Sequence, residues 1–149
     1  MISIRQLTAG SLFLAGVVVA TDAGAAELKV LSVEAMRPVL QQLAPAFEAA
    51  SKNKLTIDYA TAAAIEKKMG DEEEYDIVIV DNAITKKLDA AAKIAGGSTK
   101  SLAKQSADLS YDASTTNWTE QPLADKALID FLSAPKAAEI YKAHGMQPG

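Results

Sequence analysis

The stretch of residues 27–47, ELKVLSVEAMRPVLQQLAPAF, constrains the fold more than any other part of the chain. Its first half is a short apolar run around Val30 with polar residues before and after it, which favours a buried strand over a helix. Its second half repeats apolar residues at steps of three and four from Met36 to Phe47, and Pro38 fits a first helical turn. The stretch therefore predicts a strand, a tight turn and a helix that begins at the carboxyl end of the strand.

The same pattern recurs twice along the chain. Residues 55–59 alternate apolar and polar side chains as a strand does, and a short helix follows that we expect to end at Gly70 in a left-handed conformation. Residues 75–80, YDIVIV, form the most apolar and β-branched strand candidate, after which Asp81 or Asn82 can cap a helix that ends before the glycines at 96–97. Three alternating strands and helices predict an α/β fold: a three-layer sandwich with a small, mostly parallel sheet.

The remainder of the chain carries a weaker pattern and then a helical one. Between residues 98 and 121, apolar side chains are isolated among polar residues, so we predict a connection without regular structure. Residues 123–132 and 135–145 repeat apolar positions at helical spacing, which predicts two closing helices. The only histidine, His144, falls in the last turn of the second, where a structural role is favoured because no other histidine or cysteine can complete a metal site.

The N-terminal segment has the features of a secretory signal peptide. Arg5 gives it a positive start, residues 12–20 are apolar, and Ala23-Gly24-Ala25 is a small-residue cleavage site. The apolar run is shorter than the roughly 20 residues that a membrane-spanning helix needs, so cleavage is favoured over an anchor. We therefore expect residues 1–25 to direct export to the periplasm, with no membrane insertion after cleavage, and residues 26–149 to form one domain.

Charge and composition exclude several classes of function. The chain has 15 basic and 19 acidic residues without a basic cluster, which argues against nucleic acid as a partner. It has no cysteine, so disulfides and thiolate metal sites are absent, and the acidic run at 71–74 lacks the spaced ligands and glycine of a calcium loop. No phosphate loop, serine elbow or zinc motif occurs. We expect neither a cofactor nor a resident metal, and no enzymatic activity.

Four segments in order resemble the type II periplasmic solute-binding proteins, in particular the molybdate-binding receptors of ABC transporters. The segments are ELKVLSVEAMRPVLQQLAPAFE, LTIDYATAAAIEKKM, YDIVIVDNAI and ADKALIDFLSAPKAAEIYKAHGMQP. The resemblance implies a periplasmic-binding-protein-like lobe made of the N-terminal part and the returning C-terminal helices. The second lobe of the family would lie between them, where this chain has only the short stretch around 104–121. The resemblance therefore implies a single lobe.

The resemblance also implies a ligand site at the turns after the first two strands. Molybdate-binding relatives hold the oxyanion there with hydroxyl side chains and backbone N–H groups, and the matching positions here are Ala35 and Ala62. Backbone donors remain, while Glu34 adds a carboxylate to the first turn. The expected function is weak binding of a small oxyanion such as molybdate or tungstate at the carboxyl ends of the strands. The residues expected to line the site are Ser32, Glu34, Ala35, Met36, Thr61, Ala62 and Asp81.

Two other functions stay open on the sequence. The lobe can have lost oxyanion binding and act as a protein-interaction module or homodimer, with Trp118 and Tyr111 as anchors if they are exposed beside the crevice. Alternatively, Glu34 and Asp81 can bind a cation, since carboxylates suit hard metals. An ABC permease or a second copy of the chain is the expected protein partner.

Overall fold

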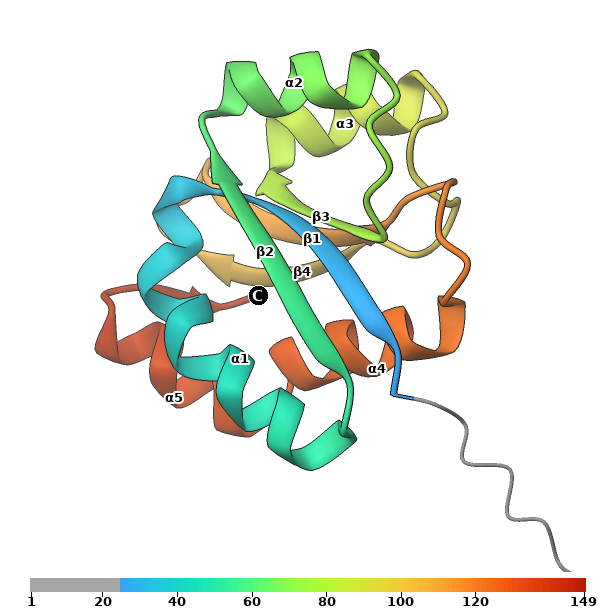
Figure 1. Cartoon of the computed structure of the whole chain (residues 1–149). Coiled ribbons are helices and arrows are strands. Elements are labelled where there is room, and N and C mark those ends of the chain that lie inside the picture. Colours follow the sequence, from blue (N-terminus) through green and yellow to red (C-terminus); the bar gives the residue numbers. More distant parts are fainter. Residues whose placement is uncertain (1–24) are drawn as a thin grey trace, which may run out of the picture.

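A six-stranded sheet lies between two layers of helices in the computed structural model, which describes residues 25–149 (Figure 1). The strands are β1 (Glu27–Val33), β2 (Lys54–Ala60), β3 (Ile77–Asp81), β4 (Lys100–Lys104), β5 (Ser110–Thr115) and β6 (Gln147–Pro148). The helices are the 3-10 helix η1 (Glu34–Met36), α1 (Arg37–Ser51), α2 (Ala62–Gly70), α3 (Asn82–Ala90), α4 (Pro122–Leu132) and α5 (Pro135–Ala143). The predicted α/β fold is confirmed. All but the last residue of the predicted signal peptide, residues 1–25, lie outside the described residues, so the signal peptide stays a prediction.

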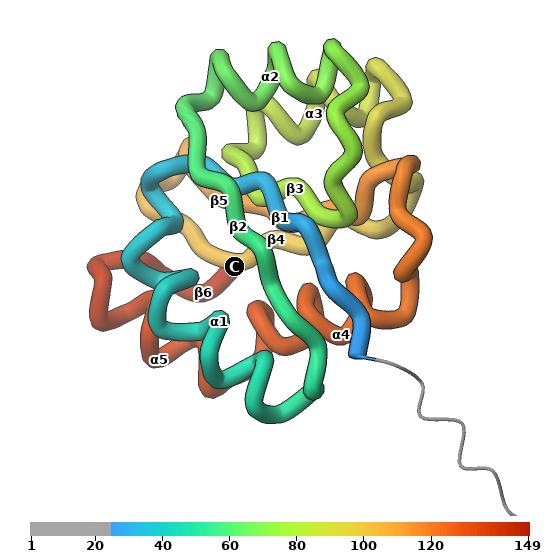
Figure 2. Tube along the Cα trace, viewed as in Figure 1, coloured from blue at the N-terminus to red at the C-terminus, as the bar shows by residue number. Residues whose placement is uncertain are grey.

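The sheet is mixed, with the order β2-β1-β3-β5-β4-β6, and Figure 2 traces how the chain builds it. The three strands expected from the sequence are parallel: β1 lies between β2 and β3 and pairs with both in the same direction. The other three strands pair antiparallel, β5 with β3, β4 with β5, and β6 with β4. The expectation of a mostly parallel sheet is corrected accordingly, because the sequence had indicated only the parallel half.

Strands β4 and β5 lie inside the segment 98–121, for which the sequence predicted no regular structure. The pattern was missed because, apart from Tyr111, the buried positions of β5 are occupied by small or polar residues rather than by large apolar ones. Ala113, Ser114 and Thr115 are all buried, at 0, 1 and 8% exposure. Such residues give no alternation of apolar and polar side chains, so only pairing with β3 reveals the strand.

The two helical layers cover opposite faces of the sheet (Figure 1). Helices α2 and α3 lie on one face, and α1, α4 and α5 on the other. Strand β3 is covered on both sides, since its four apolar residues at 77–80 are all buried. Within residues 25–149 no helix is both long and apolar enough to cross a membrane.

The two left-handed residues that follow α2 and α3 are not the predicted glycines. Helix α2 ends at Gly70 as expected, but the left-handed residue is Glu72, with φ of 59°. Helix α3 ends at Ala90, and Ala92, with φ of 54°, takes this conformation well before Gly97, which is also left-handed, with φ of 77°. Both helix ends therefore place a non-glycine residue in a region that favours glycine.

Helix α4 buries Leu128 and Leu132 as its apolar spacing predicts, but it also buries a carboxylate and exposes its first leucine. Leu123 is 84% exposed, whereas Asp125, in the first turn, is fully buried. Neither carboxylate oxygen of Asp125 has a hydrogen-bond partner among the described residues. The hydroxyl of the nearby Thr119 donates instead to Asp76 at 2.9 Å. Burial is the main reason that the pKa of Asp125 rises to about 6; the nearby Thr119 hydroxyl opposes the rise, and the negative charge of Asp76 adds to it.

Candidate functional site

Three parallel strands end at one edge of the sheet, and a helical segment begins immediately after each of them. Val33 at the end of β1 is in register with Ala60 at the end of β2, and β3 ends on the other side of β1 at Asp81. The helical segments that follow are η1–α1, α2 and α3. Their N-termini therefore meet at this edge, which we call the carboxyl edge, and direct backbone N–H groups and partial positive charge toward it.

The three N-termini differ in whether a side chain already occupies their N–H groups. The Thr61 hydroxyl accepts from the N–H of Ala64 at 3.3 Å, and so caps α2. Asp81 caps α3, since its Oδ1 accepts from the N–H groups of Ala83 and Ile84 at 2.9 and 3.0 Å. No side chain caps η1 or α1. The turn after β1 is therefore the N-terminus where no side-chain cap competes with an added anion.

The seven residues predicted for the site divide into two groups. Ser32 and Met36 are fully buried, and the Ser32 hydroxyl donates to the Val33 carbonyl at 3.2 Å. These two side chains lie beneath the edge and do not face solvent. The other five side chains reach solvent at the carboxyl edge: Glu34, Ala35, Thr61, Ala62 and Asp81.

Arg37 is the charged residue at this edge that sequence reasoning missed. Its guanidinium donates to the Glu34 carboxylate through Nε at 3.1 Å and through Nη2 at 2.9 Å to each oxygen. The same guanidinium lies 4.3 Å from the centre of the Tyr59 ring. The signal in the sequence was the spacing of three between Glu34 and Arg37, which puts both side chains on one side of the first helical turn.

Tyr59 is held between this ion pair and the core. Burial raises the pKa of its hydroxyl, the positive charge of Arg37 opposes that change, and Glu34 adds to it. The Tyr59 side chain is partly buried against the apolar core. The ring thus gives the guanidinium a fixed support at the rim of the carboxyl edge.

The turn between β4 and β5, residues 105–109, lies at the same edge. Ser110 is in register with Lys104 and Tyr111 with Asp81, and the Asn82 amide donates to the Asp108 carbonyl at 3.2 Å. Beside this turn is a polar pocket of about 450 Å³. Its lining residues are Lys104, Gln105, Ser106, Ala107, Gly145 and Gln147. The carboxyl edge thus continues across the antiparallel half of the sheet.

Neither aromatic residue proposed as an interaction anchor is exposed beside this edge. Tyr111 is 5% exposed, and its hydroxyl donates to Gln105 at 2.6 Å. Trp118 lies after β5, toward the opposite end of the sheet, where the Lys93 ammonium is 5.4 Å from the centre of its ring. The fold therefore does not present an interaction surface that these two residues anchor at the carboxyl edge.

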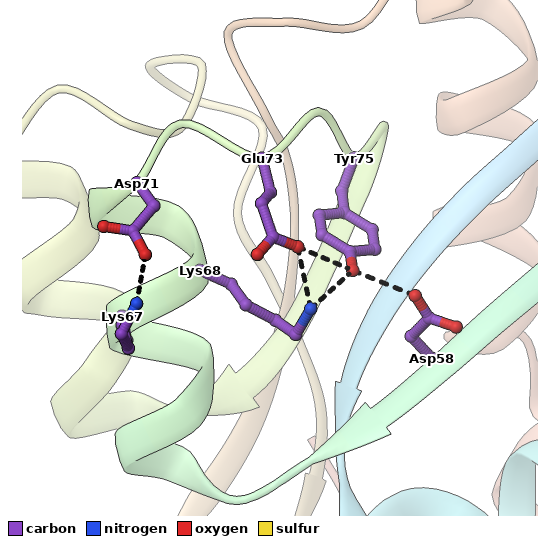
Figure 3. Close-up of polar contacts among 6 residues, drawn as sticks. All are labelled: Asp58, Lys67, Lys68, Asp71, Glu73 and Tyr75. Carbon is purple, nitrogen blue, oxygen red and sulfur yellow. Dashed lines mark hydrogen bonds and ion pairs between the residues drawn. The ribbon is translucent and has the colours of Figure 1, made fainter.

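Three of the four acidic residues at 71–74 pair with lysines, and Figure 3 draws the pairs of Asp71 and Glu73. Asp71 pairs with Lys67, Glu73 with Lys68 at 2.7 Å, and Glu72 with Lys93 at 3.1 Å. The Tyr75 hydroxyl joins this network and donates to Asp58 at 2.9 Å (Figure 3). Hydrogen bonds from their ammonium groups to these carboxylates raise the pKa values of Lys67 and Lys68. The run fixes the loop before β3 through ion pairs.

Carboxylates at the carboxyl edge also have partners within the protein. Glu34 is paired with Arg37, and Asp81 caps α3. Among residues 25–149 no group of three or more histidine, aspartate or glutamate side chains is placed to hold a metal ion. The cation alternative built on Glu34 and Asp81 therefore lacks a third carboxylate ligand in this part of the chain.

Removing the Asp81 cap is expected to destabilise the fold through α3. Asp81→Ala leaves two N–H groups without their acceptor and is expected to cost about 1 kcal/mol of unfolding free energy. Asp81→Asn keeps an accepting oxygen and is expected to change stability by less than about 0.5 kcal/mol. Urea denaturation of both variants measures this difference. Equal losses in the two variants would show that the charge, and not the cap, is the important property.

The fold and the carboxyl edge together define a class of protein. A sheet flanked by helices whose N-termini meet at the strand ends is the arrangement of a small-ligand-binding domain. The family model of the bacterial extracellular solute-binding proteins matches residues 28–115, and the chain belongs to this family. The matched residues include all seven predicted site positions.

Solved structures share this fold at low sequence identity. The substrate-binding domain of a proposed molybdenum ABC transporter from Clostridium difficile matches with a TM-score of 0.76 and 10% identity, over 84% of this chain and 100% of that one. The periplasmic molybdate-binding protein of Azotobacter vinelandii matches with a TM-score of 0.74 and 14% identity, over 82 and 99%. PEB3, with L-phospholactate bound, matches with a TM-score of 0.59 and 10% identity, over 82 and 100%. No curated protein matches the sequence.

Proposed function

We propose that this protein is a single-lobe, periplasmic solute-binding protein that binds a small oxyanion weakly at the carboxyl edge. The observation that carries the proposal is the uncapped N-terminus of η1–α1, beside the capped N-termini of α2 and α3. An anion oxygen at this turn gains backbone N–H donors and a favourable helix dipole. Because no side-chain cap has to be displaced, these donors are accessible to a ligand.

Arg37 and Glu34 set the strength of this binding in opposite directions. The guanidinium is a fork of donors suited to an oxyanion, but in the free protein it is occupied by the Glu34 carboxylate. An incoming anion has to share Arg37 with Glu34 and approach its negative charge. Weak affinity follows from this competition, with Thr61, Ala62 and Asp81 forming the neighbouring wall.

Molybdate and tungstate are the first ligands to test. The proposal takes them from the names of two proteins with the same fold, a molybdate-binding protein and a domain of a proposed molybdenum transporter. Both oxyanions are small enough for an open edge and present several oxygens to N–H donors. Transport through an ABC permease is part of the same proposal.

A thermal-shift titration with molybdate, tungstate, sulfate and phosphate tests the proposal. A ligand present at one hundred times its dissociation constant stabilises a folded protein by about 2.7 kcal/mol. We expect a saturable shift with molybdate or tungstate. A melting temperature that stays constant with every anion would reject oxyanion binding.

Neutralising Glu34 is expected to strengthen anion binding. Glu34→Gln removes the competing charge from the Arg37 fork, and both side chains are about half exposed, so a gain of roughly fivefold in affinity is expected. Arg37→Gln is expected to weaken binding by a similar factor. Isothermal titration with molybdate measures both. A Glu34→Gln protein that binds more weakly than the parent would show that Glu34 holds the ligand instead of competing with it.

The alternative of a protein-interaction module or homodimer has less support. Its two proposed anchors, Tyr111 and Trp118, are buried and partly buried, and the one large apolar side chain that is exposed among the described residues is Leu123. Leu123 lies at the start of α4, away from the carboxyl edge. Solute binding therefore remains the function that the geometry favours.

A further inference from the structure

A second pocket lies at the opposite end of the sheet from the carboxyl edge. It has a volume of about 380 Å³ and is bounded by α4 on one side and by residues 95–100, which lead into β4, on the other. Thr115, another lining residue, is in register with Ile77 at the start of β3, which fixes the position of the pocket. The volume falls within the range of about 300–1,000 Å³ that is usual for small-ligand sites.

The wall formed by residues 95–100 is fastened to strand β5. The Ser98 hydroxyl donates to the Ala95 carbonyl at 2.7 Å and accepts from the Thr115 N–H at 3.1 Å. The Ala95 N–H donates to the Thr115 carbonyl at 2.8 Å, and the Thr99 and Ser114 hydroxyls lie 2.7 Å apart. A ligand therefore meets a preformed wall, which lowers the entropy cost of binding.

The opposite wall is one face of α4. Pro122, Lys126, Ile129 and Asp130 recur at helical spacing and all line the pocket. Ile129 is 5% exposed and forms an apolar floor, while Pro122 and Ala95 add apolar sides. The interior of the pocket thus suits an apolar group.

The rim of the pocket carries one more positive than negative charge. Lys126 and Lys100 both pair with Asp130, the second at 3.6 Å between Lys100 Nζ and Asp130 Oδ1. Hydrogen bonding to Lys126 and the nearby charge of Lys100 lower the pKa of Asp130. The pair of Asp130 with Lys126 is an ordinary ion pair between residues four apart on α4. Lys100 is an additional partner of Asp130 and comes from the start of β4. Because two ammonium groups share one carboxylate, one positive charge is left unbalanced, and a second carboxylate can pair with it.

We propose that this pocket binds a small organic monocarboxylate, with its apolar body on Ile129 and Pro122 and its carboxylate between Lys100 and Lys126. The charge of such a ligand balances the rim, and its body excludes water from the apolar floor. The site is independent of the oxyanion site, since it shares no residue with the carboxyl edge.

Titration of ¹⁵N-labelled protein with hexanoate tests this proposal by NMR. Hexanoate is expected to shift the amide signals of residues 97–100 in a saturable manner. Hexylamine has the same chain with the opposite charge, hexanol has no charge, and acetate lacks the apolar body, so each is expected to bind at least roughly tenfold more weakly. Equal binding of hexanoate and hexylamine would overturn the proposal, as would hexanoate shifts confined to the turn after β1.

Charge variants separate this site from the carboxyl edge. The Lys100→Gln/Lys126→Gln protein is expected to lose roughly tenfold in hexanoate affinity, and Asp130→Asn to gain roughly threefold because the competing carboxylate is gone. Lys136→Gln, on the exposed part of α5, is the matched control and is expected to bind as the parent does. Loss of hexanoate binding in Arg37→Gln would instead assign the carboxylate to the carboxyl edge and overturn the proposal. Molybdate binding by the Lys100→Gln/Lys126→Gln protein reports on the oxyanion site separately.

Discussion

Asp125→Asn is expected to stabilise this protein by up to about 3 kcal/mol at pH 7. The carboxyl group is fully buried without a hydrogen-bond partner among the described residues, and its pKa rises from 3.8 to about 6 in the folded protein. The folded state therefore holds this proton more tightly than the unfolded state does. The resulting stabilisation is complete below pH 3.8 and is lost as the pH rises to about 6, a difference of about 3 kcal/mol. Asparagine cannot ionise and avoids the loss.

Chemical denaturation of the parent and Asp125→Asn proteins between pH 4 and pH 8 measures this effect. The two curves of unfolding free energy are expected to lie close together near pH 4 and to separate up to pH 6. Asp130→Asn is a control of opposite sign, because Lys126 and Lys100 lower the pKa of that exposed carboxyl. A gap between parent and Asp125→Asn that stays constant over the whole pH range would show that the buried carboxyl does not titrate there.

Met36→Ala is expected to destabilise the protein by about 2–5 kcal/mol. Met36 was predicted to line the ligand site, but its side chain is fully buried in the core beneath the carboxyl edge. Truncation removes apolar contacts and leaves a cavity in a closely packed interior, which accounts for the size of the effect. Urea denaturation measures the loss.

The conservative variant distinguishes a packing role from a ligand contact. Met36→Leu preserves most of the buried volume and is expected to cost less than about 1.5 kcal/mol. Both variants are expected to bind molybdate, per folded molecule, as the parent protein does. If the Met36→Leu protein had normal stability but clearly weakened molybdate binding, Met36 would have to contact the ligand.

The parallel half of the fold could be read from the sequence because its signals are local. The apolar run at 77–80 predicted a strand, and all four residues are buried because helices cover both faces of it. Asp81 was recognised as a candidate cap, and its side chain accepts N–H bonds in the structure. Periodicity and capping depend on residues a few positions apart, so one sequence is enough to find them.

The antiparallel half could not be read in this way. After Tyr111, the buried positions of β5 hold small or polar residues such as Ala113 and Ser114, so no alternation marks the strand. Its stability comes from pairing with β3 and β4, and the β3 partner Val78 is far from Ser114 in sequence. A strand that is stabilised by pairing with residues distant in sequence carries no local sequence pattern that predicts it.

The same division holds for the candidate site. The sequence by itself determined the α/β class, the three strand-to-helix turns and the family, because these follow from local patterns and ordered motifs. Only the tertiary structure decided which turn lacks a side-chain cap, that Arg37 is held between Glu34 and Tyr59, and that Met36 is buried. The physical reason is that burial and charge pairing depend on which side chains the fold brings together, and not on their spacing along the chain.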